Sequence, residues 1–88
     1  MQRDVVIPNK LGLHARTSAK FVALANQFAC DVTLKRDDLE VNGKSLMAIL
    51  TLAASQGTTI NIATQGAQAS EALQALLDLV EQGFGEEP

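Results

Sequence analysis

The side chains that could carry chemistry in this sequence gather around one histidine. His14 is the only histidine among 88 residues, Arg16 follows two positions later, and Cys30 is the only cysteine. One histidine and one cysteine cannot form a zinc site, and no group of acidic residues has the spacing of metal ligands. The glycines form neither a phosphate-binding loop nor a dinucleotide fingerprint. We therefore expect no metal and no cofactor, which leaves His14 as the candidate reactive group.

His14 is a candidate phosphoryl acceptor because a helix is predicted to begin directly after it. Apolar residues with a period of 3.6 predict that helix from residues 15–16 to about 27. The first N–H groups of a helix lack intrahelical acceptors, and the helix dipole adds positive potential there. A phosphoryl group on the imidazole could accept hydrogen bonds from this backbone and from the Arg16 guanidinium. The alternative is a histidine that only caps the helix or lies at the surface.

The charge distribution favours an anionic group near His14. The net charge is −3, which gives no support to nucleic-acid binding. Residues 5–30 contain Lys10, Arg16 and Lys20 but no acidic residue, whereas the last third of the chain is acidic. Because no acid lies near His14 in the sequence, a Ser-His-Asp arrangement is not readable. We expect a locally positive face suited to a phosphoryl group or an acidic partner; the alternative is that three cations fall there by chance.

Ser45 is a second candidate site, because it precedes the apolar stretch 46–54. Serine at this place is typical of a helix N-cap, and a phosphoserine can also be accommodated there; the two interpretations are compatible. Apolar residues cover more than half the circumference of the predicted helix 46–54. One sheet can hardly cover that much, so part of it, including Met47, should face solvent and mark a partner surface. The alternative is that neighbouring elements cover the helix on two sides.

The remaining patterns predict the elements that hold these residues. Besides the two helices, we expect strands at 5–7, 31–36, 39–41 and 59–64, and a last helix around 73–80 that stops at Gly83. The order β-α-β-β-α-β-α is typical of an α+β fold. We expect an open-faced two-layer sandwich in which three helices cover one face of a four-stranded sheet, as a single domain over residues 1–88. The chain is expected to be frayed beyond Phe84.

Cysteine content and hydropathy indicate the compartment. A single cysteine cannot form an internal disulfide, which fits a reducing compartment, and Cys30 is expected to be a small buried hydrophobic residue. The sequence shows neither the apolar region of a signal peptide nor an apolar run long enough to span a membrane. We expect a soluble, cytoplasmic monomer with no membrane or nucleic-acid partner.

Two motifs and their separation resemble the HPr family, the histidine-containing phosphocarriers of the bacterial phosphotransferase system. They are Asn-Lys-Leu-Gly-Leu-His-Ala-Arg at 9–16 and Asn-Gly-Lys-Ser-Leu-Met at 42–47, and the resemblance extends over nearly the whole chain. It implies that His14 accepts a phosphoryl group on Nδ1 from phosphorylated Enzyme I and passes it to an EIIA-type protein. The chain would then be a carrier and not an enzyme. Residues 79–87 are similar to nitrogen-branch or proteobacterial variants.

The resemblance also implies roles for individual residues. Arg16 would stabilise the phosphoryl group, with backbone donors from Ala15, Arg16 and Thr17. Ser45 is similar to the serine that HPr kinase/phosphorylase modifies in members that have such a kinase. The implied partner-docking surface comprises Ala19, Lys20, Leu46, Met47 and Leu50. Thr17 departs from the family, which usually has proline there; a threonine restores a backbone donor and is expected to loosen the turn.

Two other functions stay open at this point. The chain could be a regulatory module in which phosphorylation of Ser45 controls docking to a transcription factor or kinase, while transfer through His14 is vestigial. It could also be an α+β interaction domain unrelated to phosphoryl transfer. Labelling of His14 by Enzyme I separates the carrier from both.

Overall fold

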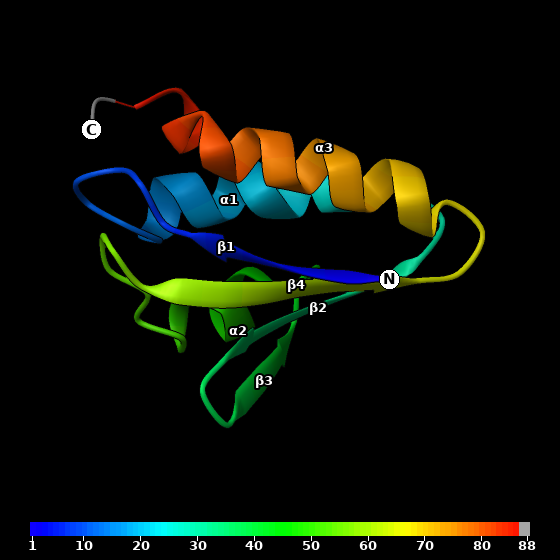
Figure 1. Ribbon diagram of the computed structural model, residues 1–88, viewed down its shortest axis with the longest axis horizontal. Coiled ribbons are helices and arrows are strands. Elements are labelled where there is room, and N and C mark those ends of the chain that lie inside the picture. Colours follow the sequence, from blue (N-terminus) through cyan, green and yellow to red (C-terminus); the bar gives the residue numbers. More distant parts are fainter. Residues whose placement is uncertain (87–88) are drawn as a thin grey trace.

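The computed structural model describes residues 1–86 and places helices on one face of a four-stranded sheet (Figure 1). The strands lie in the order β1-β4-β2-β3, and every neighbouring pair is antiparallel. The strands are β1 (Gln2–Val6), β2 (Asp31–Arg36), β3 (Leu39–Asn42) and β4 (Thr59–Gln65). The helices are α1 (Ala15–Ala25), α2 (Leu46–Leu50) and α3 (Ala69–Glu81), followed by the short 3-10 helix η1 (Gly83–Gly85). The predicted open-faced α+β sandwich is confirmed.

The core lies between the sheet and the helices and is mainly aliphatic. Side chains alternate along β4, so that Ile60 and Ile62 are buried while their neighbours face the open side. Helices α1 and α3 run side by side above the sheet (Figure 1), with Phe21 and Leu76 fully buried between the layers. Each such side chain contributes about 1.5–3 kcal/mol of burial free energy. This packing holds the beginning of α1 against the rest of the molecule.

Strand β1 starts earlier than the sequence pattern predicts. It covers residues 2–6 instead of 5–7, and its register pairs Gln2 with Ala63 and Val6 with Thr59 of β4. The polar residues at its start hid the strand, because β1 lies at the edge of the sheet and most of its side chains are exposed. Backbone pairing with β4, and not apolar content, sets its length.

Helix α2 is shorter than predicted and ends at Leu50 instead of residue 54. The chain turns there, and Ala53 takes a positive φ of 49°. The Arg36 guanidinium donates to the carbonyl oxygens of Leu52 at 2.9 Å and Ala53 at 2.7 Å. Leu52 is still buried, so its apolar character reflects the core and not a helix. The carbonyl of the next residue, Ala54, contacts the loop before His14.

The segment after α3 folds back onto the molecule. Phe84 is buried, and the chain runs on to Glu86, whose carboxylate contacts His14 at the end of the loop between β1 and α1. The prediction of fraying beyond Phe84 is therefore wrong for residues 85 and 86, while residues 87–88 lie outside the described part. Cys30 is half-buried against the core, and not fully buried as expected. Within residues 1–86, none of the helices has the length and apolar character needed to cross a membrane.

Candidate functional site

His14 is the N-cap residue of α1, and its imidazole faces the start of the helix. Its backbone is extended, with φ −104° and ψ −172°, and its carbonyl accepts the first helical hydrogen bond, from Ser18 N at 2.9 Å. The Arg16 backbone N–H donates to Nδ1 of the imidazole at 3.2 Å. A nitrogen that accepts this bond carries a lone pair and not a proton. Nδ1 is therefore the unprotonated nitrogen, directed at the positive end of α1.

Thr17 holds the turn that presents His14. Its hydroxyl accepts from the His14 backbone N–H at 3.0 Å and donates to the Gly12 carbonyl at 2.9 Å. With the bond from Arg16 N–H to the His14 ring, this completes a capping box, and Thr17 is fully buried. The expectation that threonine loosens the turn is therefore wrong. The threonine side chain forms hydrogen bonds with the backbone of both Gly12 and His14, which a proline could not do.

The loop before His14 is packed closely against the segment that follows α2. Leu13 N–H donates to the Ala54 carbonyl at 2.8 Å, and the fully buried Asn9 donates to the Gly12 carbonyl at 3.0 Å. Gly12 has a φ of +69°, and a Cβ there would lie 2.4 Å from the Ala54 oxygen. Only glycine fits this position, because both the conformation and the contact exclude a side chain. The position of His14 thus depends on residues some forty positions away.

Glu86 is the acidic partner that the sequence around His14 lacks. Both of its carboxylate oxygens lie 3.1 Å from His14 Nε2, although 72 positions separate the two residues. The carboxylate also accepts from Asn9 Nδ2 at 3.2 Å and lies 3.9 Å from the Arg16 guanidinium. The sequence predicted a region around His14 without acidic groups, and the contact with Glu86 shows that this prediction is wrong. The acidic last third of the chain supplies one, because the segment after α3 returns to the beginning of α1.

This environment keeps the Glu86 carboxylate ionised. The hydrogen bond with the His14 ring lowers the pKa of Glu86 below its usual value, and the bond from Asn9 and the positive charge of Arg16 act in the same direction. Partial burial raises the pKa, but its effect is smaller than that of the His14 hydrogen bond. At neutral pH the contact thus joins a carboxylate to an imidazole whose Nε2 donates the hydrogen bond.

The groups predicted to bind a phosphoryl group lie around Nδ1. The amide of Arg16 points at it, and the amides of Ala15 and Thr17 belong to the same first turn of α1. The Arg16 side chain is 76% exposed, so that its guanidinium is free to move toward an anion bound there. The start of α1 can therefore offer several N–H groups to an anion on Nδ1.

The residues predicted to dock partners lie on the neighbouring faces of α1 and α2, which pack against each other. Ala19, Lys20, Leu46 and Met47 are exposed and Leu50 is half-buried. Met47 is 73% exposed, whereas Ile49 on the opposite side of α2 is fully buried. Part of the apolar surface of α2 thus faces solvent, as predicted. The Lys20 ammonium group donates to the Phe84 carbonyl at 2.8 Å, which ties this face to the segment that carries Glu86.

Ser45 is the N-cap of α2, as its position in the sequence predicts. Its hydroxyl oxygen accepts from the Ala48 backbone N–H at 3.3 Å, and its backbone is extended. The side chain is half-buried and lies directly before the exposed Leu46 and Met47. A capping role is therefore present, and the hydroxyl lies beside the exposed side chains of α2.

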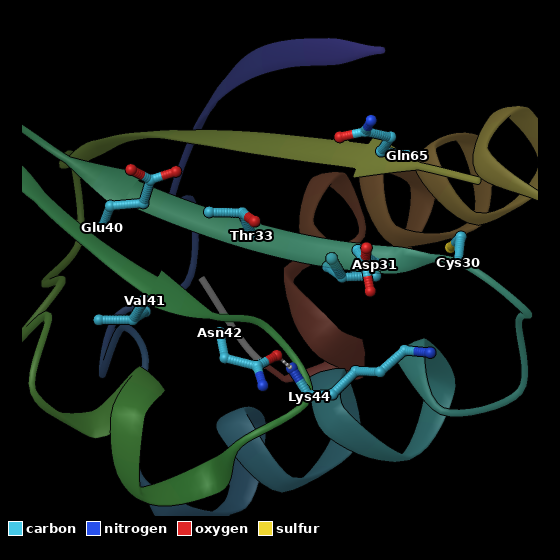
Figure 2. A pocket seen from close by; sticks show the side chains of 9 residues that line it. Cys30, Asp31, Thr33, Glu40, Val41, Asn42, Lys44 and Gln65 are labelled. Carbon is cyan, nitrogen blue, oxygen red and sulfur yellow. Dashed lines mark hydrogen bonds between the residues drawn. The ribbon is translucent and has the colours of Figure 1, made fainter.

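A broad hollow on the sheet lies away from His14. It has a volume of about 560 Å³ and is lined by residues of β2, β3, the end of β4 and the connection to α2. Figure 2 shows Thr33 and Glu40 on the sheet, and the side chain of Lys44 extending away from Asn42. His14 and Arg16 are not among its lining residues. His14 thus stands apart from this hollow, on a helix end beside an exposed apolar face, an arrangement that suits a protein that hands a group to other proteins.

Comparisons with known proteins agree with this class. Residues 1–82 match the family model described as the PTS HPr component phosphorylation site. The phosphocarrier protein HPr of Neisseria meningitidis serogroup A is 48% identical over 98% of this chain and 97% of its own length. HPr of Pseudomonas putida is also 48% identical, over 96% and 94% of the two chains. A crystal structure of HPr from Thermoanaerobacter tengcongensis superposes with a TM-score of 0.96 at 41% identity, covering 100% and 99% of the chains.

The chain belongs to the HPr family. It is a phosphocarrier protein of the phosphotransferase system and not itself an enzyme. Its partners accordingly include enzymes of that system. The resemblance found in the two sequence motifs is confirmed, and its proteobacterial character agrees with the Neisseria and Pseudomonas relatives.

Proposed function

We propose that His14 accepts a phosphoryl group on Nδ1 from phosphorylated Enzyme I and passes it to an EIIA-type protein. The observation that carries this proposal is the Arg16 N–H that points at Nδ1 from 3.2 Å at the start of α1. It directs an unprotonated, nucleophilic nitrogen at the place where a helix best stabilises an anion. Arg16, together with the backbone of Ala15, Arg16 and Thr17, binds the phosphoryl oxygens once they arrive.

The step is a simple exchange of one P–N bond for another. The lone pair of His14 Nδ1 forms the new bond to phosphorus, while the bond to the donor histidine breaks and its electron pair returns to the donor nitrogen. The Arg16 N–H then exchanges its acceptor, from Nδ1 to a phosphoryl oxygen.

The surface on which donor and acceptor dock comprises the exposed Leu46 and Met47 on α2, with Ala19 and Lys20 on α1. We propose that the protein works in the cytoplasm as a monomer.

The test is phosphoryl labelling by phosphoenolpyruvate and Enzyme I. We expect the chain to gain one acid-labile phosphoryl group, detected by mass spectrometry, and to transfer it to added EIIA. The His14→Ala variant should gain none while keeping its fold. Absence of label from the unmodified chain under these conditions would remove the carrier role from His14.

We further propose that phosphorylation of Ser45 regulates docking. Its hydroxyl lies at the edge of the exposed surface of α2, where a phosphoryl group would add about −1.5 to −2 charges. The new charge would repel an acidic partner approaching Leu46 and Met47. The same group would remain compatible with the helix start, because a helix N-terminus accommodates anions.

Ser45→Asp is expected to raise the KM of Enzyme I for this chain about tenfold, as like charges meet in the docked complex. Ser45→Ala is the matched control. It should cost about 0.5–2 kcal/mol of stability through the lost cap, yet leave KM close to that of the unmodified chain. Kinetics of phosphoryl transfer and thermal unfolding of both variants measure these effects. Equal KM values for the aspartate and alanine variants would exclude an electrostatic role for Ser45.

A further inference from the structure

The contact between Glu86 and His14 is partly buried, and a further buried side chain stabilises it. The Glu86 side chain is only 14% exposed, and its carboxylate is held by Nε2 of His14 and by the amide of the fully buried Asn9. A carboxylate with both oxygens 3.1 Å from one nitrogen is well placed to accept a hydrogen bond from the N–H of that nitrogen. Such a position differs from that of a surface acid that meets a histidine by chance.

The segment that carries Glu86 is anchored independently of His14. Phe84 is 1% exposed although its φ is 58°, a left-handed conformation that is unfavourable for a non-glycine residue. Burial of the ring offsets this strain by a comparable amount. Lys20 of α1 adds a hydrogen bond of 2.8 Å to the Phe84 carbonyl. The fold therefore holds a strained turn in place, and this turn positions the Glu86 carboxylate at His14 Nε2.

The chemistry of phosphoryl acceptance places a positive charge on the ring next to this carboxylate. When the Nδ1 lone pair forms the bond to phosphorus, the ring still carries its proton on Nε2 and becomes an imidazolium. A carboxylate that accepts a hydrogen bond from that N–H stabilises the new positive charge and keeps the ring oriented. Glu86 lies on the far side of the ring from the nucleophilic nitrogen, so it can do this without occupying the phosphoryl site.

We propose that Glu86 is a positioning residue for phosphoryl transfer through His14, which keeps the proton on Nε2 and stabilises the imidazolium formed as Nδ1 binds phosphorus. This inference rests on the proposed function of His14. No proton leaves the ring during acceptance: Nε2 keeps its hydrogen, shared with Glu86, and the electron pair of the broken P–N bond returns to the donor imidazole. Passing the group on reverses these changes and restores the neutral ring.

The charges of the site make this arrangement suited to a carrier. Phosphorylation brings a dianion to Nδ1, on the ring whose Nε2 contacts the Glu86 carboxylate, and the Arg16 guanidinium lies 3.9 Å from that carboxylate. Repulsion between the two anions keeps the phosphorylated state from becoming too stable. The same carboxylate that assists acceptance therefore also favours onward transfer. The lowered pKa of Glu86 means that it is ionised while it does so.

Steady-state phosphorylation by Enzyme I and phosphoenolpyruvate tests the proposal on the full chain. We expect Glu86→Gln to lower kcat about tenfold, the order of one charge-assisted hydrogen bond, with KM unchanged within about twofold. Glu81→Gln is the matched control, because it removes the same charge from an exposed position at the end of α3. It should leave both constants unchanged. Glu86→Asp, which keeps the charge, should recover part of the loss.

Nitrogen NMR of the His14 ring supplies a readout that a purely structural role would not move. In the unmodified chain the Nε2 proton should exchange slowly and show the shift of a strong hydrogen bond, and in Glu86→Gln both features should weaken. A kcat for Glu86→Gln equal to that of Glu81→Gln would overturn the proposal, as would a rise in KM alone, which marks a docking residue. Absence of label from the unmodified chain would refute the proposed function of His14 and this role with it.

Discussion

Gly12→Ala is expected to lower the free energy of unfolding by about 2–5 kcal/mol and to slow phosphoryl transfer at least tenfold. The φ of +69° costs an alanine about 1–2 kcal/mol. The new Cβ would lie 2.4 Å from the Ala54 oxygen and 2.8 Å from the Ser55 Cα, so that backbone must move, at about 1–3 kcal/mol. Because Leu13 bonds the same carbonyl, this movement displaces the residue before His14.

Gly57→Ala separates the two causes. Gly57 also has a positive φ, +86°, but a Cβ there would meet nothing within 4 Å. It should therefore cost only the conformational strain, about 1 kcal/mol, and leave transfer unchanged. Denaturant unfolding and the rate of labelling by Enzyme I measure both variants. If Gly12→Ala behaves like Gly57→Ala, close packing of the loop on Ala54 does not hold His14 in place.

Arg16→Ala is expected to slow phosphoryl transfer about tenfold to a hundredfold while changing stability by less than about 1 kcal/mol. The side chain is 76% exposed and its nearest acidic atom is 3.9 Å away, so the folded state gains little from it. A guanidinium next to the phosphoryl oxygens, in contrast, stabilises charge that develops only during transfer, where loss of one donor costs about a hundredfold or more. The backbone N–H that points at Nδ1 is kept in the variant.

Two further variants make this expectation specific. Arg16→Lys should recover only part of the rate, because an ammonium group is a point charge and lacks the planar pair of donors. Lys10→Ala removes a cation from the same stretch of chain and should leave transfer nearly unchanged, since Lys10 is exposed in the loop before Gly12. Labelling kinetics and thermal unfolding compare the three. Full activity of Arg16→Ala would show that the backbone of α1 alone binds the phosphoryl group.

The amino-acid sequence by itself determined the local structure around both candidate sites. The caps at His14 and Ser45, the amphipathic helices α1 and α3 and the alternating strands β2 and β4 follow from residue types and spacing. These features depend on hydrogen bonds and side chains within a few positions of one another, and such interactions repeat with the period of the element. For the same reason the four strands and three helices were predicted in the correct order.

The tertiary structure alone decided what surrounds the imidazole of His14. Glu86 reaches the imidazole because the path of α3 along the sheet and the turn around Phe84 together bring the chain back to it. No local sequence pattern predicts where this combined path ends. The glycines on both sides of Phe84 were the one available signal, since an aromatic residue between glycines suits a packed turn. Distance along the chain concealed the contact: residues separated by 72 positions meet through packing, and packing depends on the whole fold.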